Sequence, residues 1–156
     1  MSTPAGWRVR AAVGADAQAL LALRLALWPD ADDSVADDGV TELQAALARA
    51  DASHLLVVDD ADAALGFAEV SVRHDYVNGT ESTPVGFLEG WYVAPAWRGR
   101  GLGRALVAAA VAWTRDRGCT ELASDAQLDD GGAQAAHAAC GFEPTERVVY
   151  YRLQLA

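Results

Sequence analysis

Lysine is absent from this chain of 156 residues, so all 12 of its Lys and Arg positions are arginine. A P-loop needs a Gly-Lys pair before a Ser or Thr, and that nucleotide site is therefore excluded. Cysteine is almost absent too, since only Cys119 and Cys140 occur. They cannot make a disulfide framework, and no cluster of three or more Cys and His residues at metal-ligand spacing surrounds either one. We therefore expect reduced thiols, a cytoplasmic location and no metal site.

Positive charge is scarce as well. The formal net charge is −10, and acidic residues gather at Asp30–Asp38 and Asp59–Asp62. Nucleic acid is not an expected partner, because its recognition needs a basic surface. The negative field would attract a cationic substrate, although solubility is a sufficient explanation for any single acidic run.

Long apolar stretches are missing. No apolar run approaches the roughly 18 residues of a membrane-spanning helix, so no membrane partner is expected. The segment Met1–Gly6 lacks the basic and apolar regions of a signal peptide. The composition, with 52% hydrophobic and 22% charged residues, is that of a globular protein, and the length suits one domain over residues 1–156.

The most informative segment is the stretch WYVAPAWRGRGLG from Trp91 to Gly103. An apolar run ends at Pro95, and glycines at 99, 101 and 103 lead into an Ala/Leu/Val-rich helical pattern. Glycines open the backbone to a ligand, and the free N–H groups of a helix start favour an anion. Arg98 and Arg100 add positive charge. The segment predicts a pyrophosphate site, and a glycine-rich turn that only caps a helix is the alternative.

Periodicity and turn residues predict the element order βααβββαβαβ. We expect strands at 7–12, 54–59, 64–74, 85–93, 120–125 and 142–153, and helices from the N-cap Asp16 to Trp28, around 40–47, at 101–117 and at 134–140. Asp30–Asp38 is expected to be a loop. A right-handed crossover should make strands 85–93 and 120–125 parallel, with antiparallel hairpins before them. The prediction is an α/β fold with a mixed central sheet and helices on both faces.

The spacing Arg98-x-x-Gly101-x-Gly103 resembles the acyl-coenzyme A signature of the GNAT acetyltransferases. A dinucleotide fingerprint would instead need a glycine at position 104, which is arginine. The element order is also that of GNAT proteins, so the resemblance covers nearly the whole chain. It implies a single GNAT N-acetyltransferase domain with the GNAT acyltransferase fold, and acetyl-coenzyme A (acetyl-CoA) as acetyl donor.

Longer strings resemble one GNAT branch, the bacterial aminoglycoside 6′-N-acetyltransferases. They are Leu27-Trp28-Pro29, RHDYVNG at 73–79, FLEG at 87–90, ASD at 123–125, GFE at 141–143 and TERVVY at 145–150. The resemblance implies an antibiotic-resistance enzyme in which the 6′-amine of an aminoglycoside attacks the thioester directly. A GNAT enzyme for another small amine or polyamine, and a non-catalytic acyl-CoA-binding sensor, are the alternatives.

Two carboxylates are the candidate catalytic groups. Glu89 lies in an apolar strand, where an unpaired charge is costly, and by alternation it shares a face with Phe87, Trp91 and Val93. Asp125 ends the neighbouring parallel strand, so both could converge on the ammonium groups of a substrate. A salt-bridged Glu89 and a turn-capping Asp125 are the structural alternatives. The resemblance assigns both positions to the amines of the aminoglycoside.

The resemblance also gives the backbone N–H of Val93 to the thioester oxygen, with an ordinary ladder hydrogen bond as the alternative. It places His137 where many GNAT proteins have the acid that protonates the thiolate, although a lone helical histidine is often a surface or core residue. Trp28, Asp75 and Tyr76 are expected to line the acceptor pocket, or simply to pack. The expected cofactor-binding residues are Val93, Arg98, Gly99, Arg100, Gly101, Leu102, Gly103, Asp130 and His137.

Two departures concern the cofactor. Asp130 and Ala133 stand where the family usually has an asparagine that contacts pantetheine and a serine. An ionised Asp130 cannot donate a hydrogen bond, and Gly131-Gly132 should loosen this loop.

The final strand, with alternating Val148, Tyr150 and Arg152, could pair with a second copy to form a homodimer, or pack within its own sheet.

Overall fold

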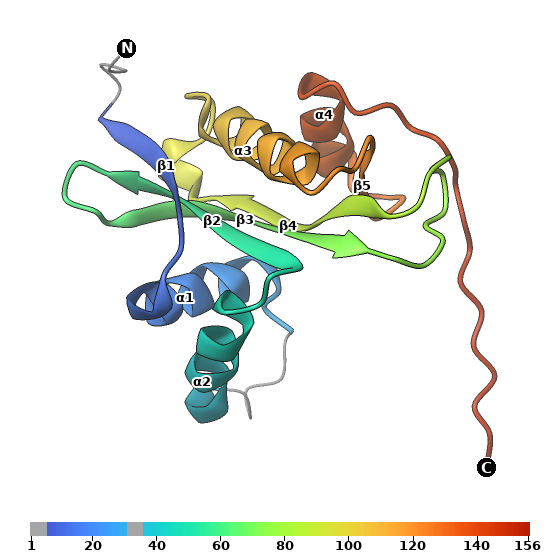
Figure 1. The fold of residues 1–156 in the computed structure, drawn as a ribbon, viewed down its shortest axis with the longest axis horizontal. Helices are drawn as coiled ribbons and strands as arrows, with labels where there is room; N and C mark the ends of the chain where they lie inside the picture. The colour runs from blue at the N-terminus through green and yellow to red at the C-terminus, as the bar shows by residue number, and fades with distance from the viewer. Residues whose placement is uncertain (1–5, 31–35) are drawn as a thin grey trace.

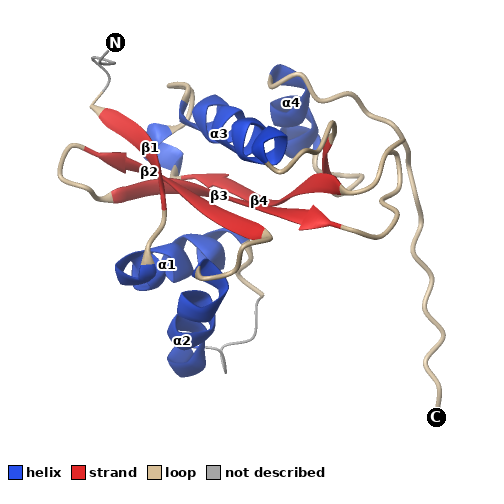
Figure 2. Ribbon diagram, viewed as in Figure 1, coloured by secondary structure: helices blue, strands red, loops and turns tan. Residues whose placement is uncertain are grey.

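A computed structural model describes residues 6–30 and 36–156. Its centre is one twisted sheet, with α1 and α2 below it and α3 and α4 above it in the view of Figures 1 and 2. The elements are β1 (Trp7–Ala11), α1 (Ala17–Leu27), α2 (Ala36–Leu47), β2 (Ala52–Asp59), β3 (Ala64–Arg73), β4 (Val85–Val93), α3 (Leu102–Asp116), β5 (Leu122–Ser124) and α4 (Gly131–Ala139), with short 3-10 turns η1 (Gly14–Asp16) and η3 (Pro95–Trp97).

The sheet is mixed, as predicted. Its strand order is β1-β2-β3-β4-β5, in which the first four strands are antiparallel and β4 and β5 are parallel. The crossover through α3 explains the parallel pair. Among the described residues no helix is both long and apolar enough to cross a membrane.

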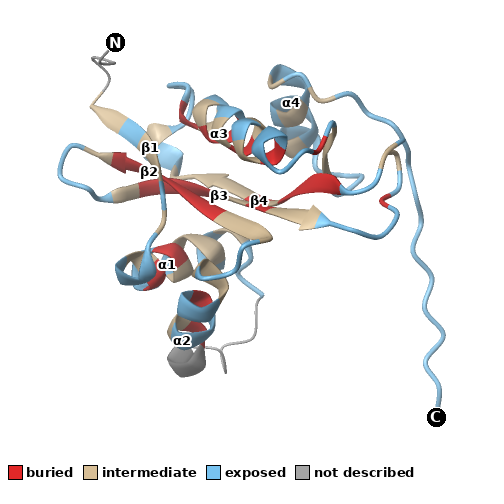
Figure 3. Cartoon of the chain, in the orientation of Figure 1, coloured by how far each residue is buried: buried red, intermediate tan, exposed pale blue. Residues whose placement is uncertain are grey.

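The core has a layer on each face of the sheet, because the central strands are buried on both sides (Figure 3). In β2, Leu55 and Val57 pack in the α3 layer, while Leu56 and Val58 pack in the α1 layer. The apolar stripe of α3, with Leu102 and Leu106 buried, completes the upper layer. Successive side chains of a strand point to opposite faces, so continuous apolar strands serve both layers.

A β-bulge interrupts the pairing of β3 with β4. Glu69 pairs with Gly90 and Val70 pairs with Leu88, so Glu89 is the extra residue between them. The expected alternation therefore fails at this point. Trp91 and Val93 pack in the α3 layer, whereas Glu89 contacts side chains of the opposite face. A bulge re-aims a side chain in this way.

β4 and β5 separate after three residue pairs. Gly86, Phe87 and Leu88 pair with Leu122, Ala123 and Ser124, and β4 then continues alone on that side to Val93. We call this opening between the two strands, beyond Ser124, the notch. Ligands of open α/β sheets bind where parallel strands diverge in this manner.

The largest error of the sequence prediction is the final strand. Residues 142–153 form no strand in the structure. The chain after α4 instead runs down the side of the molecule, and its end projects away from it (Figure 1). Tyr150 and Tyr151 are 83% and 92% exposed. An isolated extended segment needs a partner strand before it can form a ladder.

Smaller errors lie at element ends. β5 is shorter than the predicted 120–125, and α4 begins at Gly131 rather than at Gln134. Gly131-Gly132 are thus helical and not a loosened loop. Within the predicted loop Asp30–Asp38, α2 already begins at Ala36, while residues 31–35 lie outside the described residues.

Asp16 precedes α1 as predicted, but its carboxylate does not cap the helix. It accepts hydrogen bonds from the Val13 backbone N–H at 2.7 Å and from both Nη atoms of Arg10 at 2.7 and 2.8 Å. Hydrogen bonding from Arg10 lowers the pKa of Asp16. Asp16 therefore joins β1 to the start of α1.

Replacing Asp16 by asparagine should lower the free energy of unfolding at pH 7 by about 1 kcal/mol. Because the pKa of Asp16 is lower in the folded protein, its contribution is complete above the unfolded value of about 4 and is lost as the pH falls through the folded pKa. Denaturant unfolding at several pH values should show wild type and variant converging in acid. Asp51→Asn, in a more exposed pair with Arg49, is the matched control and should change stability less.

Candidate active site

The glycine-rich loop has the backbone that its sequence predicts. Gly99 and Gly101 have φ values of +76° and +90°, in the left-handed region that favours glycine. Gly101 is the N-cap of α3, and no side chain caps the N–H groups of the first turn. The start of this 15-residue helix is uncapped and follows the exposed Arg98 and Arg100, and these features favour an anion. The first turn of α3 thus matches a pyrophosphate.

The loop is held against β4. The indole Nε1 of Trp91 donates to the carbonyl of Gly103 at 3.1 Å, and a Cβ on Gly103 would lie 3.3 Å from that ring. Arg98 Nε donates to the carbonyl of Val93 at 2.8 Å. Leu102 is buried, so it meets a ligand through its backbone only. These contacts hold the glycine loop at the end of β4.

The N–H of Val93 points toward the notch. Ala94 N–H donates to Leu65 at 2.8 Å, and Gly66 is opposite Val93. In an antiparallel ladder, hydrogen-bonded pairs alternate with pairs that are not hydrogen-bonded to each other. Because Ala94 and Leu65 are hydrogen-bonded, the pairs of Val93 with Gly66 and of Trp91 with Ala68 are not, and the N–H groups of Val93 and Trp91 face away from β3. An ordinary hydrogen bond to β3, the alternative for Val93, is thus excluded. Trp91 offers a second N–H that the sequence prediction missed.

Glu89 forms a salt bridge with Arg73, which is the alternative to an unpaired catalytic carboxylate. Its Oε1 accepts from Ser71 Oγ at 2.7 Å and from Arg73 Nε at 3.0 Å, and its Oε2 accepts from Arg73 Nη2 at 2.7 Å. The guanidinium also lies 3.5 Å from the ring centroid of Phe87. The Glu89 side chain keeps 28% of its exposure, so a substrate can still reach it. Ser71 and Arg73 were not predicted as site residues.

Arg73 connects Glu89 to Asp125. The hydrogen bond from Arg73 to Glu89 is the main cause that raises the pKa of Arg73, and the charge of Asp125 acts in the same direction. Asp125 is exposed and directly follows β5. Asp125 is thus near enough for its charge to act on Arg73, which is the hydrogen-bond partner of Glu89.

His137 lies across the notch from the side of α4. Its ring meets Trp91 edge-on with centroids 5.4 Å apart, and Phe142 at 5.2 Å. Its Nε2 lies 2.8 Å from Ser124 Oγ, and its Nδ1 lies 2.6 Å from the Ala133 carbonyl. The ring is half-buried, so it is neither a free surface group nor a core residue. Ser124, the hydrogen-bond partner of His137, was not among the predicted site residues.

Asp130 is the N-cap of α4. Its Oδ1 accepts a hydrogen bond from the Ala133 N–H at 3.0 Å. Replacing Asp130 by alanine would therefore weaken the start of α4, which carries His137. Its predicted contact with pantetheine stays a prediction.

Trp28, one of the predicted acceptor residues, lies on the other side of β4. Trp28 is 37% exposed, meets Phe67 edge-on at 6.2 Å, and covers Gly90, where a Cβ would lie 2.6 Å from the indole. Asp75 and Tyr76 are exposed in the loop between β3 and β4. Trp28 thus borders the bulge that carries Glu89, and the pocket roles of Asp75 and Tyr76 stay predictions.

A cavity of about 310 Å³ borders Glu89 on this face. Glu69 and His54 line the same cavity, where Glu69 binds Arg24 and lies 3.5 Å from the buried His54. Burial opposes ionisation of Glu69, but hydrogen bonding from His54 and the charge of Arg24 prevail and lower its pKa. A second ionised carboxylate, paired with Arg24, therefore lines this cavity. The described residues contain no cluster of three or more His, Cys, Asp or Glu side chains that could hold a metal ion.

The comparisons with known proteins agree with this geometry. Residues 20–142 match the model of the acetyltransferase (GNAT) family. An aminoglycoside N(6′)-acetyltransferase type 1 from Stenotrophomonas maltophilia is 59% identical over 147 residues, which cover 94% of this chain and 93% of that protein.

Solved structures are similar over nearly the full length. The crystal structure of an aminoglycoside antibiotic 6′-N-acetyltransferase from Acinetobacter baumannii has a TM-score of 0.88 and 38% identity, covering 97% of this chain and 100% of that one. The structure of AAC(6′)-Iy in complex with the bisubstrate analogue CoA-S-monomethyl-acetylneamine has a TM-score of 0.87 and 38% identity, covering 96% and 99%. An uncapped helix start that suits an anion, and arginine-paired carboxylates on the opposite face of the sheet, thus occur in a chain that is similar throughout to enzymes of one kind. The chain belongs to the GNAT family of acetyltransferases, in the branch of the aminoglycoside N(6′)-acetyltransferases.

Proposed function

We propose that this protein transfers the acetyl group of acetyl-CoA to the 6′-amine of aminoglycoside antibiotics and so confers resistance to them. The observation that carries the proposal is the 59% identity to an aminoglycoside N(6′)-acetyltransferase over nearly the full length of both chains. The site supports it, because a helix start that favours a phosphate follows β4, and β4 also carries Glu89, a carboxylate suited to a cationic acceptor.

Each predicted residue has a role in this reaction. The loop from Arg98 to Gly103 holds the pyrophosphate with its N–H groups and arginine charge. The N–H of Val93, and that of Trp91, polarise the thioester oxygen, as an oxyanion hole does. Glu89 and Asp125 bind ammonium groups of the acceptor and bring its 6′-amine to the acetyl carbon. The reaction then needs only orientation, loss of a proton from the amine and protonation of the sulfur.

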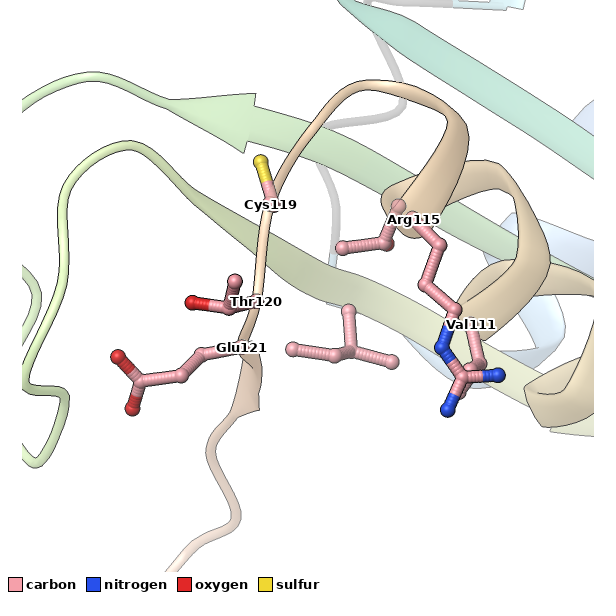
Figure 4. A pocket seen from close by; sticks show the side chains of 7 residues that line it. Val111, Arg115, Cys119, Thr120 and Glu121 are labelled. Carbon is pink, nitrogen blue, oxygen red and sulfur yellow. The ribbon is translucent and has the colours of Figure 1, made fainter.

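Transfer is direct, because neither cysteine is placed to form an acyl-enzyme. Cys119 is buried after the C-terminal end of α3, beside a surface cavity of about 410 Å³ (Figure 4). That cavity lies at the opposite end of α3 from the glycine loop. Burial raises the pKa of the Cys140 thiol, which makes it a poor nucleophile at neutral pH.

The test is thiol release from acetyl-CoA with kanamycin, tobramycin, spermidine and a lysine peptide, followed by NMR of the product. Turnover of the two drugs with acetyl on the 6′-nitrogen is the expected result. Preference for spermidine or the peptide would instead identify a GNAT enzyme for another amine. Acetyl-CoA binding without turnover of any amine would identify a sensor.

We infer that the protein is a homodimer in which each copy binds the C-terminal segment of the other. Residues 148–156 carry exposed apolar side chains, among them Val149, Tyr151, Leu153 and Leu155, and exposed apolar surface of this extent needs a cover. β5 is the edge of the sheet, and an edge strand offers unpaired backbone groups. A second copy of the segment supplies both a strand for that edge and a cover for the apolar side chains.

Deleting residues 148–156 should convert a dimer into a monomer with the same fold. Light scattering after gel filtration measures the mass of both proteins, and circular dichroism checks the fold. An Arg152→Ala variant keeps the apolar side chains and should stay dimeric. A wild-type monomer at micromolar concentration would contradict the proposal.

We also infer a cytoplasmic location. Both cysteines are free, as expected in a reducing compartment. The acetyl donor, acetyl-CoA, is an intracellular metabolite.

A further inference from the structure

The hydrogen bonds of His137 determine where its protons are. Nδ1 lies 2.6 Å from the Ala133 carbonyl, which can only accept, so Nδ1 carries a hydrogen. In the neutral ring Nε2 then carries no hydrogen, and its lone pair accepts a hydrogen bond from the Ser124 hydroxyl, whose Oγ lies 2.8 Å from Nε2. A neutral His137 therefore has no N–H that faces the notch. Only the imidazolium has one, and that N–H points at Ser124 Oγ.

Ser124 stands where the notch begins. It is the last residue of β5 and pairs with Leu88, whose carbonyl lies 3.3 Å from Ser124 Oγ. The N–H groups of Trp91 and Val93 face the same opening from β4. The ring of His137, edge-on to Trp91, closes the notch from the α4 side. The Ser124 hydroxyl is thus the group of this pair that borders the opening between the strands.

We propose that Ser124 passes the proton to the departing sulfur of coenzyme A, and that His137 resupplies Ser124. This inference rests on the proposed function and adds a residue to it. Ser124 is the last donor of a two-residue relay, and His137 is the proton source behind it. The carbonyl of Ala133 holds the ring in place throughout, because Nδ1–H donates a hydrogen bond to this carbonyl in both protonation states of the ring.

The proton balance of the step is complete. The neutral amine nitrogen forms a bond to the acetyl carbon, and the carbon–sulfur bond breaks with its electron pair on the sulfur. The sulfur takes the hydroxyl proton of Ser124, while the Ser124 oxygen takes the Nε2 proton of the imidazolium. The new bond leaves the nitrogen positively charged, and this nitrogen releases a proton to solvent water as the carbon–sulfur bond breaks. The products are an amide, a thiol, a neutral His137 and this released proton, and the separate proton lost by the ammonium group before attack restores the imidazolium.

The first test compares Ser124→Ala with Ser124→Thr, which keeps the hydroxyl. The alanine variant should lose about 100-fold in kcat with kanamycin, a typical effect of removing general acid catalysis, while the Kd for acetyl-CoA stays unchanged. The threonine variant should stay within about threefold. Ser82→Ala is the matched control, because it also removes a hydroxyl bonded to a side chain, here Glu121, outside the site.

A double variant separates a relay from two independent contributions. If Ser124 and His137 act as one path, Ser124→Ala combined with His137→Gln should be no slower than the slower single variant. Losses that multiply would overturn the relay, as would a Ser124→Ala enzyme with full kcat. Thermal unfolding of each variant excludes misfolding as the cause.

Nitrogen-15 NMR of the free protein gives a readout that does not depend on turnover. The neutral ring of His137 should be the Nδ1–H tautomer, and Ser124→Ala should shift the Nε2 resonance alone. A neutral ring with its hydrogen on Nε2 would overturn the relay. A wild-type protein that acetylates none of the drugs overturns the proposed function instead, and the spectra then still decide whether the pair exists.

Discussion

Replacing Glu89 by glutamine should lower kcat/KM for aminoglycosides by about 100-fold, close to 2.7 kcal/mol. Two effects add in this variant. First, the ammonium groups of the acceptor lose the carboxylate that binds them. Second, Arg73, whose Nη2 lies 2.7 Å from Oε2 of Glu89 in the wild type, keeps a positive charge that no carboxylate neutralises and that repels the acceptor. The Kd for acetyl-CoA, measured calorimetrically, should not change, because Glu89 lies in the middle of β4 on the face opposite to the α3 layer, whereas the glycine loop follows the end of this strand.

The double variant Glu89→Gln with Arg73→Gln tests the second effect. Removing the uncompensated cation should restore part of the lost kcat/KM, about tenfold. If Glu89→Gln alone keeps kcat/KM within about threefold of wild type, Glu89 serves only to hold Arg73, and the assignment of Glu89 to the acceptor is wrong.

Replacing Gly101 by alanine should weaken acetyl-CoA binding by about five- to thirtyfold. Gly101 has a φ of +90°, and no atom lies within 4 Å of the position that a Cβ would take, so the cost comes from backbone strain and not from a clash. The left-handed conformation costs a non-glycine residue roughly 1–2 kcal/mol, which corresponds to this loss of affinity when the loop relaxes. Isothermal titration with acetyl-CoA measures the effect without turnover.

Gly131→Ala is the matched control, because Gly131 also has open space around its Cα but no positive φ. Its Kd for acetyl-CoA should equal that of wild type. Equal affinity of the Gly101→Ala protein would contradict the placement of the pyrophosphate at the start of α3.

Much of the fold could be predicted from the sequence, because its signals are local. The apolar strands, the stop at Trp28-Pro29 and the glycine at 118 after α3 each depend on a few adjacent residues. The phosphate loop belongs to the same class, since its glycines, its arginines and the following helix are contiguous. The mixed sheet then follows from the handedness of the crossover.

The site could be predicted less completely, because its geometry depends on pairing between strands. Alternation along β4 correctly predicted that Glu89 shares a face with Phe87, but it wrongly added Trp91 and Val93 to that face. The bulge that separates them arises from the register with β3 and leaves no mark in the sequence of β4 alone. The partners of Glu89, Ser71 and Arg73, lie two strand positions apart on β3, and only the register brings them to it.

The final segment shows a different limit. Its alternating apolar residues from Val148 to Leu153 are a valid strand pattern, but a strand forms only where an edge is available to pair with it. Within one copy this segment is extended and exposed. The sequence thus indicated the capacity to pair and not the partner.

Comparing neomycin with paromomycin, which carries a hydroxyl in place of the 6′-amine, tests the central claim most directly. With purified protein and acetyl-CoA, thiol release should be rapid with neomycin, and mass spectrometry should show one added acetyl group. Paromomycin should give no release above the rate without acceptor. Equal turnover of both drugs would show that another amine is acetylated and would contradict the assignment to the 6′ position.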